Sequence, residues 1–463
     1  MSRSSLVFPL LLVALVFVGC AEKNVGTIPN LPPETYIAIA DSVRNPVVYV
    51  QRICWWGEDL DGEVVGYEYR CTLDTSETGC GVTEDWVATT EKSMVFNFPV
   101  TRGVAIHKVE VRAVDDQGAK DPTPASVTLP LFNSPPSVEF LERGSLPDTT
   151  YPAIRLKWRG SDPEGNQTIA GYMLRLDGSN RLIPFGAKDT TGCLGFEDFE
   201  GRYGQRTVYL YAIDTGCDTS KPTTYTWYVR EPRGRVLLVD NLPKAYGGYK
   251  LTDAFYRSAV ESVFSEYSIL DIERFGGAAY TYAFERLFDM FDIVIWYNDP
   301  WYDPTLGRET IYLSEAVPTI VEYVSRGGKF LLASLCAIGT RGAFHDSVAM
   351  DFFGIDEPYW YKKNVSDFSC KRWVVKGNRD LGLEEIKVDG NYQGCECFRP
   401  KDSATALFWI DAGTMENQMV DYYIGLGNSY GDGKVVLVTF PFSRSNIYGN
   451  LKKVFGAVMD YLD

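Results

Sequence analysis

The segment WRGSDPEG at residues 158–165 has a counterpart, WGEDLDG, at 56–62, and this repeat decides how the first half of the chain is organised. Three further pairs of segments match in the same order: PPET at 32–35 with PPSV at 135–138, GYEYR at 66–70 with GYMLR at 171–175, and VEVRAVD at 109–115 with VYLYAID at 208–214. Within each copy, strand-like segments alternate with turns rich in Gly, Pro and Asp, as in a β-sandwich of about 100 residues. The repeat therefore predicts two all-β sandwiches, at 34–131 and 135–231.

Both copies resemble the fibronectin type III-like modules of bacterial surface proteins. The resemblance is carried by a tryptophan that ends strand B, by the Gly-Tyr pair that opens strand C, and by the Arg-Ala-Val-Asp of strand F. It implies an immunoglobulin-like sandwich in each copy and implies no particular ligand. We expect Trp56 and Trp158 to fill the space between the two sheets, where each would bury ~150–250 Å².

Acidic residues gather in the turn that follows each of these tryptophans, namely Asp59, Asp61 and Asp162. Asp and Gly build turns through local hydrogen bonds, and this is the interpretation we favour. The alternative is a calcium site, because clustered carboxylates are hard oxygen ligands. Neither turn matches the spacing of an EF-hand loop.

Composition excludes several classes of function. The 463 residues include 45 Lys and Arg against 61 Asp and Glu, a formal charge of −16, which would repel nucleic acid. The only histidines are His107 and His345, which limits histidine-based catalysis and most zinc chemistry. No phosphate-binding loop, dinucleotide fingerprint, metalloprotease motif or nucleophile elbow is present, so no cofactor is expected.

The N-terminus has the pattern of an export signal. Arg3 precedes the apolar stretch Leu6 to Val18, which is too short for a permanent membrane helix. The segment VFVGC at 16–20 resembles a bacterial lipobox, with Phe17 where Leu is commonest. The resemblance implies a signal peptide at 1–19, lipidation of Cys20 and a tether at 20–33 that holds the chain on the envelope. Because Ala21 rather than Asp follows, we expect the outer membrane, on its periplasmic or surface face; the alternative is ordinary secretion.

Export makes disulfides plausible for the nine remaining cysteines, of which at least one must stay unpaired. Cys71 and Cys80 flank a short polar loop, as a hairpin staple would. Cys193 and Cys217 lie in one expected sandwich and form a second candidate pair. Cys370 could join Cys395 or Cys397, a choice that the sequence leaves open.

After Gly234 the sequence changes from β-rich repeats to alternating strands and helices. RVLLVD at 235–240 is a continuous apolar run ending in Asp, typical of a strand buried on both faces. Further strands are expected at 267–272, 291–297, 329–333 and 434–440, and helices at 252–264, 282–290, 311–326 and 446–462. This alternation predicts an α/β three-layer domain at 234–463 with a mostly parallel sheet, interrupted around 353–432 by an insertion of extra strands.

The C-terminal part resembles the class I glutamine amidotransferase-like, flavodoxin-like group of α/β domains. The resemblance rests on strand order, on FDIVI at 291–295 and on GGKFLL at 327–332. In that family a nucleophilic cysteine follows this strand between glycines, and a histidine and a glutamate follow the last strand. Here Cys336 lies in SLCAIG without flanking glycines, and TFPFS at 439–443 contains no histidine. A pairing of Cys336 with His345 would be a new arrangement, so the catalytic triad is expected to be absent.

Ligands of open α/β sheets bind beyond the carboxyl ends of the strands. The candidate ligand-binding residues at these ends are Asp240, Asn241, Tyr297, Asn298, Asp299, Trp301 and Ser334. Aromatic side chains beside carboxylates suit sugars or peptides, although Trp301 could equally pack its loop onto the sheet.

Two functions follow from the sequence. The one we favour is a non-catalytic lipoprotein of the bacterial cell envelope, in which sandwich modules present an α/β domain to an envelope protein or a glycan. The alternative is a lipid-anchored hydrolase or amidotransferase-like enzyme that uses Cys336 or an acidic pair such as Asp240 and Asp299.

Overall fold

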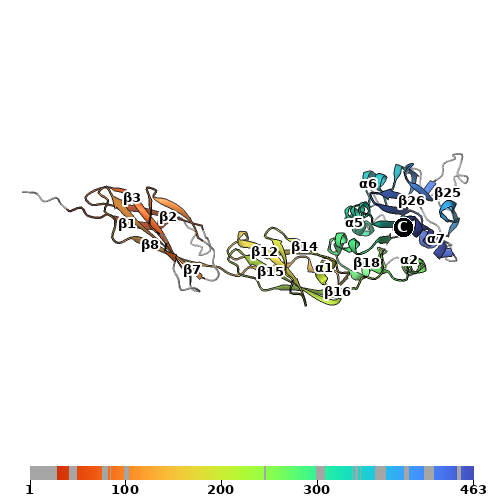
Figure 1. Cartoon of the computed structure of the whole chain (residues 1–463), viewed down its shortest axis with the longest axis horizontal. Coiled ribbons are helices and arrows are strands. Elements are labelled where there is room, and N and C mark those ends of the chain that lie inside the picture. Colours follow the sequence, from red (N-terminus) through yellow and green to blue (C-terminus); the bar gives the residue numbers. More distant parts are fainter. Residues whose placement is uncertain are drawn as a thin grey trace, which may run out of the picture. The chain divides into compact units, whose positions relative to one another are not determined.

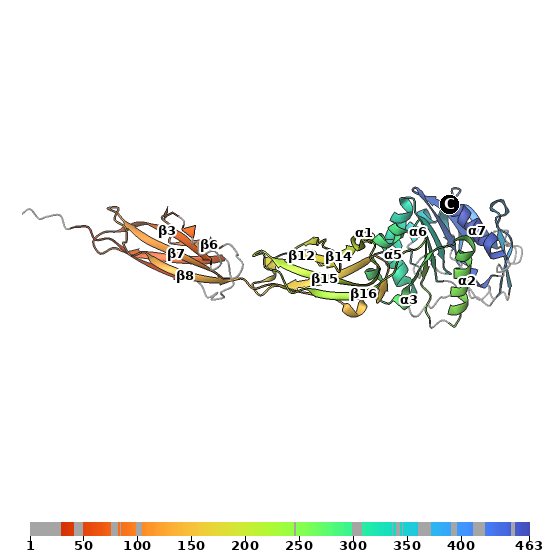
Figure 2. The same cartoon turned by 60° about the horizontal axis from the view of Figure 1, so that its bottom comes forward.

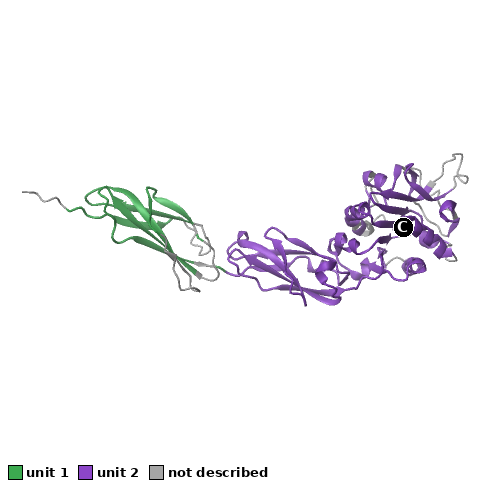
Figure 3. Cartoon of the chain, in the orientation of Figure 1, with its two compact units in different colours: residues 1–133 green, residues 134–463 purple. Residues whose placement is uncertain are grey.

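The computed structural model is mostly β-sheet with few helices and describes most of the chain after residue 28 (Figure 1). The described residues are 29–40, 50–75, 82–83, 85–98, 104–244, 247–298, 308–335, 337–338, 343–344, 346–359, 372–389, 396–410, 422–445 and 450–463. The chain forms two compact units, and the boundary between them lies between Asn133 and Ser134 (Figure 3). Among the described residues, no helix is long and apolar enough to cross a membrane.

The first unit contains one sandwich. One sheet has the order β1-β2-β6, with bounds Glu34–Ile39, Val50–Glu58 and Ser93–Asn97. The other contains β4 (Val82–Thr83), β3 (Val64–Thr75), β7 (Val104–Asp115) and β8 (Ala125–Phe132) in that order, and β5 (Val87–Thr89) also pairs with β3. Ile53, Trp55, Tyr67, Val109 and Val111 lie buried between the two sheets. The expected immunoglobulin-like sandwich is therefore present.

The prediction that Trp56 is the core tryptophan of this sandwich is wrong by one residue. Trp55 is 1% exposed, whereas Trp56 is 45% exposed and stacks on Tyr36 of the neighbouring strand at 5.4 Å. Successive side chains of a strand point to opposite faces, so a shift of one residue exchanges inside for outside. Trp55 stands two residues before Gly57, as the buried Trp158 stands two residues before Gly160. Trp55 is therefore the counterpart of Trp158.

The second unit begins with the second sandwich. One sheet has the order β10-β16-β15-β12-β13, with bounds Thr149–Thr150, Thr223–Val229, Gly204–Asp214, Ile169–Leu176 and Ile183–Gly186. The other has the order β14-β11-β9, with bounds Thr191–Leu194, Ile154–Ser161 and Ser137–Phe140. Short helices lie between strands: η1 (Arg143–Ser145), η2 (Asn166–Thr168) and α1 (Phe196–Phe199). Trp158 is fully buried in this core, as predicted.

A sheet of eleven strands fills the C-terminal region, 236–463. Five neighbouring strands are parallel, in the order β18-β17-β19-β20-β27, with bounds Ser268–Asp271, Val236–Asp240, Ile293–Tyr297, Lys329–Ala333 and Gly433–Val438. The remaining strands add antiparallel pairs: β26 (Tyr422–Tyr430), β25 (Thr405–Ile410), β22 (Arg372–Gly377), β23 (Ile386–Asp389), β21 (Ile355–Tyr359) and β24 (Cys397–Pro400). All six of these strands lie within the expected insertion around 353–432.

Both faces of this sheet are covered, because alternate residues of its parallel strands enter two different cores. In β17, Leu237 and Val239 join a core with α5 (Arg308–Ser325) and α6 (Asp346–Phe352), whereas Val236 and Leu238 join a core with α2 (Tyr249–Val263) and α7 (Leu451–Leu462) (Figure 2). The smaller helices are α3 (Ile272–Phe275), η3 (Ala279–Tyr282), α4 (Phe284–Leu287), η4 (Phe288–Met290), η7 (Arg379–Leu381) and η9 (Phe442–Arg444).

The second sandwich packs directly against the C-terminal region. Tyr151, which follows β10, is 2% exposed and belongs to the core on the α5 side of the sheet. Its hydroxyl donates to the carbonyl oxygen of Ile269 at 3.0 Å and accepts from the Ile269 N–H at 2.8 Å. Arg155 forms an ion pair with Glu285 at 2.5 Å, and the Lys157 ammonium lies 3.6 Å from the centre of the Tyr280 ring. These contacts join the second sandwich to the sheet, so the parts before and after the expected boundary near 232–234 belong to one compact unit.

The expected disulfide between Cys193 and Cys217 is not formed, and both are free cysteines. Cys193 pairs with Arg155 near the start of β11, and its thiol donates to Glu285 at 3.1 Å. Burial, above all, raises the pKa of this thiol to about 11. Cys217 lies in the turn after β15, at the other end of the sandwich. Arg155, the partner of Cys193, is six residues from the far end of β11, which corresponds to ~20 Å along the strand. The two Cα atoms of a disulfide lie less than about 7 Å apart, so this pair cannot form. The other expected pairs involve Cys80, Cys370 and Cys395, which lie outside the described residues.

Candidate functional site

Five of the predicted ligand-binding residues lie together at the carboxyl ends of adjacent parallel strands. Asp240 and Tyr297 are the last residues of β17 and β19, and Asn241, Asn298 and Ser334 directly follow β17, β19 and β20. Backbone hydrogen bonds extend past the strands here, since the Asn241 N–H donates to Tyr297 and the Asn298 N–H to Ala333, each at 3.1 Å. All five side chains are buried. Asp299 and Trp301 lie outside the described residues.

Asp240 is the central carboxylate of this edge. It is 1% exposed and accepts hydrogen bonds from the Leu242 N–H and from the Tyr249 hydroxyl, both at 3.1 Å. The pKa of Asp240 is raised to about 7, chiefly by burial and also by the negative charges of Asp271 and Asp253, while the hydrogen bond from the Leu242 N–H acts in the opposite direction. Near neutral pH the group therefore exists in both protonation states, and it can both donate and accept a hydrogen bond.

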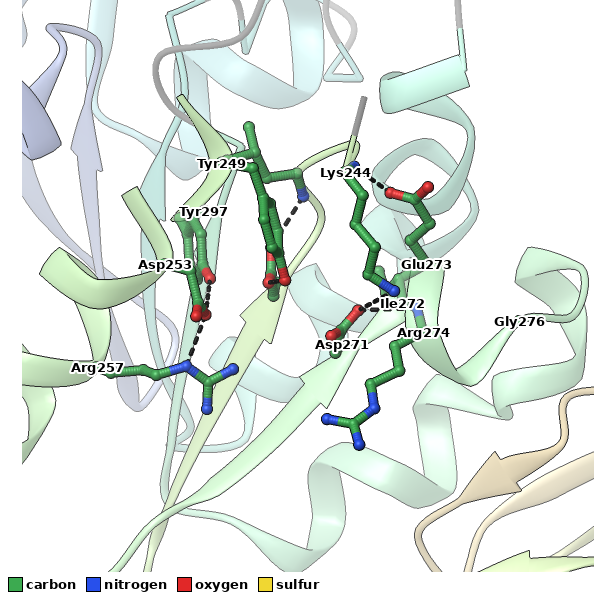
Figure 4. Close-up of polar contacts among 12 residues, drawn as sticks. Lys244, Tyr249, Asp253, Arg257, Asp271, Ile272, Glu273, Arg274, Gly276 and Tyr297 are labelled. Atoms are coloured by element: carbon green, nitrogen blue, oxygen red, sulfur yellow. Dashed lines mark hydrogen bonds and ion pairs between the residues drawn. The ribbon is translucent and has the colours of Figure 1, made fainter. Parts of the chain in front are cut away.

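Asp253 and Asp271 are near enough to Asp240 for their charges to act on it, and each is paired with a cation (Figure 4). Asp253 on α2 accepts from Arg257 Nε at 2.7 Å and from the Tyr297 hydroxyl at 3.3 Å. Asp271 ends β18 and begins α3, where it accepts from the Arg274 N–H at 2.8 Å and lies 3.9 Å from Lys244 Nζ. Asp240, Asp253 and Asp271, with the side chains that contact them, are called the polar edge below.

The chemistry of the polar edge is that of hydrogen bonding. Three carboxylates, two tyrosine hydroxyls and two cations offer both donors and acceptors. Within the described ranges, no group of three or more His, Cys, Asp or Glu side chains is arranged to hold a metal ion. Such an edge suits a ligand with several hydroxyl or amide groups.

The turn after β20 is a second site, because it is where Cys336 of the amidotransferase-like pattern falls. Cys336 and His345 themselves lie outside the described residues. The Ala337 N–H donates to the Glu396 carboxylate at 2.9 Å, and the Ile338 N–H donates to both of its oxygens at 3.2 and 3.3 Å. The hydroxyl of Thr439, which follows β27, donates to the Glu396 carbonyl oxygen at 2.6 Å. The backbone N–H groups of Ala337 and Ile338 in this turn are therefore already hydrogen-bonded to the carboxylate of Glu396.

Sequence reasoning missed several residues of these two sites. Asp271 could have been predicted, because it lies near the carboxyl end of an expected strand, and that strand pairs with β17. Ligands bind beyond the carboxyl ends of such strands, which is the reasoning that identified Asp240. Asp253 and Arg257 are four residues apart on an expected helix, a spacing that predicts an ion pair but no link to Asp240. Glu396 had no signal, because it meets Ala337 across 59 residues of sequence.

The acidic turns of the two sandwiches have the predicted local geometry. The Asp61 N–H donates to Asp59 Oδ1 at 3.2 Å, and the Glu164 N–H donates to Asp162 Oδ1 at 2.8 Å. Both are bonds from a backbone N–H to an Asp two residues earlier, as expected for turn-building Asp. Burial is the largest cause that raises the pKa of Asp162, to about 6.

Comparisons with known proteins give partial similarities. No family model matches the sequence, and no curated protein matches it. The fibronectin(III)-like modules of Clostridium thermocellum CbhA are 14% identical and cover 42% of this chain and 94% of their own, with a TM-score of 0.19. A putative ThuA-like protein from Bacteroides uniformis is 12% identical over 51% of this chain and 93% of its own, with a TM-score of 0.31. The PKD1 domain of Vibrio anguillarum Epp is 17% identical over 22% of this chain and 98% of its own, with a TM-score of 0.14.

Proposed function

We propose that the chain is a non-catalytic lipoprotein of the bacterial cell envelope. In this proposal Cys20 carries the lipid, the two sandwiches form a stalk, and residues 236–463 form an α/β head of the flavodoxin-like, amidotransferase-like class. The head binds a glycan or an envelope protein through the polar edge. The packing of Tyr151 into the core of the head supports this arrangement, because it fixes the last sandwich to the head that it presents.

The observation that carries the proposal is the Glu396 carboxylate in the turn after β20. If Cys336 were a nucleophile, the N–H of the next residue, Ala337, would be placed to stabilise the oxyanion that forms on the substrate. That N–H is bonded to Glu396 at 2.9 Å. An oxyanion beside this carboxylate would be repelled rather than stabilised, since two negative charges at short range raise each other's free energy. The turn is therefore suited to hold the chain's own acid and unsuited to acyl transfer.

The polar edge is the part of the head that the proposal assigns to binding. Its partly exposed groups are Tyr249, which donates to the buried Asp240, and the ion pair of Asp253 with Arg257. Hydroxyl-rich ligands such as glycans are recognised by this combination of carboxylate, guanidinium and tyrosine.

Asp253→Asn in the full-length protein is expected to weaken glycan binding by about tenfold or more, because a charged hydrogen-bond acceptor contributes about 1.5–3 kcal/mol. A glycan array gives the ligand, and titration of wild type and variant gives the affinities. Asp289→Asn is the matched control, since Asp289 also pairs with an arginine, Arg326, at 3.2 Å but lies away from the edge. Equal loss in both variants, or turnover of the bound glycan that Cys336→Ser abolishes, would contradict the proposal and favour the enzyme.

The anchor is tested separately in a bacterial host. Wild type is expected to carry lipid on Cys20 and to fractionate with membranes, whereas Cys20→Ala is expected to accumulate as an unlipidated precursor. Intact mass of the mature protein and membrane fractionation are the measurements. A stable anchor needs two acyl chains or more, because one holds only marginally. A mature wild-type protein that begins after Cys20 without added lipid mass would show ordinary secretion instead.

A further inference from the structure

One carboxylate oxygen is left without a hydrogen-bond donor at the same position of both sandwiches. Asp59 Oδ2 and Asp162 Oδ2 are buried and have no partner, although the other oxygen of each side chain accepts the bond of its turn. The two residues are counterparts in the repeat, since each lies two residues after the glycines Gly57 and Gly160. Asp162 as a whole is 8% exposed. A buried carboxylate oxygen without a donor or a cation is costly, and here the same cost occurs twice.

The surroundings of these two oxygens are also built alike. In the first sandwich the Leu31 N–H donates to the Asp61 carboxylate at 3.1 Å, and in the second the Ser134 N–H donates to the Glu164 carboxylate at 3.1 Å. The segment that enters each sandwich is thereby tied to the acidic turn. We call this end of each sandwich its acidic pole.

Further oxygens converge on the acidic pole of the first sandwich. Asn30 Oδ1 is buried and unpartnered, while the amide nitrogen of the same side chain donates to Asp115 at 2.6 Å. A Cβ added to Gly62 would lie 2.8 Å from Asp59 Oδ2 and 2.9 Å from Asp116 Oδ1, so both carboxylates turn toward one small space beside the glycine. Among the described residues, no Lys or Arg forms an ion pair with Asp59, Asp115 or Asp116.

We propose that each sandwich binds one calcium ion at its acidic pole, with Asp59 and Asp162 as equivalent ligands. Calcium takes six to eight oxygen ligands from carboxylates, amide and backbone carbonyls and water, in a flexible geometry. In the first sandwich the unpartnered Asp59 Oδ2 and Asn30 Oδ1 are oxygens of this kind, and in the second Asp162 Oδ2 is. Magnesium fits less well, because it demands a near-octahedral shell and loses water reluctantly.

The expected affinity is that of an extracellular module. Since no three acidic side chains among the described residues form a closed metal cage, water would complete the shell, and dissociation constants near ~10⁻⁴–10⁻³ M are expected. Binding would tie the entering segment to the turn, through Asn30 in the first sandwich and through the Ser134–Glu164 contact in the second. This inference is independent of the function proposed for the head.

Equilibrium dialysis of the full-length protein against radioactive calcium tests the proposal. Wild type is expected to bind two ions, Asp59→Asn and Asp162→Asn one each, and the double variant none. Asparagine retains an oxygen for the bond of the turn and removes the charge. Asp177→Asn is the matched control, because Asp177 accepts the Thr207 N–H at 2.9 Å just after β12, at the end of that strand opposite the pole. This variant is expected to bind two ions.

A second measurement, the melting temperature of the wild-type protein in calcium, tests the proposal even if a variant folds poorly. The wild-type melting temperature is expected to rise between about 0.1 and 10 mM calcium and to rise less in magnesium, because a ligand that binds only the folded state stabilises it. Absence of bound calcium in wild type at about 10 mM would overturn the proposal. So would two bound ions in the folded double variant, which would place the calcium elsewhere on this acidic chain.

Discussion

Tyr151→Ala is expected to lower the free energy of unfolding of the second unit by about 3–5 kcal/mol, the range for removing a large aromatic side chain from a core. The ring is 2% exposed and meets Phe275 and Phe291 at 6.5 and 6.0 Å between ring centres. Its hydroxyl also completes two hydrogen bonds with the backbone of Ile269 on the edge strand β18. The substitution therefore opens a cavity in the head and leaves two backbone groups unpaired.

Hydrogen exchange read peptide by peptide shows where this loss falls. In Tyr151→Ala, the peptides of β18 and β17 are expected to lose protection together with those of the second sandwich, because one side chain joins both. Tyr151→Phe retains the ring and removes the two hydrogen bonds, so a smaller loss of about 1–3 kcal/mol is expected. If β18 kept its protection in Tyr151→Ala while the second sandwich lost its own, the two parts would be independent, and the proposal that Tyr151 fixes this sandwich to the head would be wrong.

The strands of the C-terminal sheet could be predicted from the sequence because of where they lie. A strand covered on both faces is apolar at every position, so the runs at 235–240, 291–297 and 329–333 are distinctive, and each contains a parallel strand of the structure. Their carboxyl ends then follow from the register, which is why Asp240 and Tyr297 could be expected near each other.

The errors have one physical origin, which is that contacts between distant segments leave no local pattern. Trp55 and Trp56 are adjacent and equally apolar, and only the pairing of β2 with its neighbours decides which one faces the core. Cys193 was predicted to form a disulfide, yet its side chain contacts Arg155 on the adjacent strand β11 and Glu285 in the head. Glu396, which immediately precedes β24 of the insertion, contacts the turn after β20, and no periodicity in either segment indicates that contact.

Asp240→Asn is expected to stabilise the second unit at neutral and alkaline pH and to leave its stability unchanged in acid. The folded pKa of Asp240 is about 7 against an ordinary 3.8, so between these values the folded state binds a proton that the unfolded state has released. Folding stability therefore falls as the pH rises through this window, by about 4 kcal/mol once the pH exceeds 7. Asparagine is neutral throughout and removes this loss.

Urea unfolding of wild type and Asp240→Asn at pH 4, 6 and 8 measures the effect as a difference at each pH. The difference is expected to be near zero at pH 4, intermediate at pH 6 and largest at pH 8. Asp460→Asn, which changes an exposed Asp on α7, is the matched control at each pH. A difference that is the same at all three pH values would show that Asp240 is not held near neutrality by its surroundings. A carboxyl group that weakens the fold at neutral pH is not required by the fold. Its position between Tyr249 and two further carboxylates at the carboxyl edge therefore points to binding as its role, and the same variant should lose glycan affinity where it gains stability.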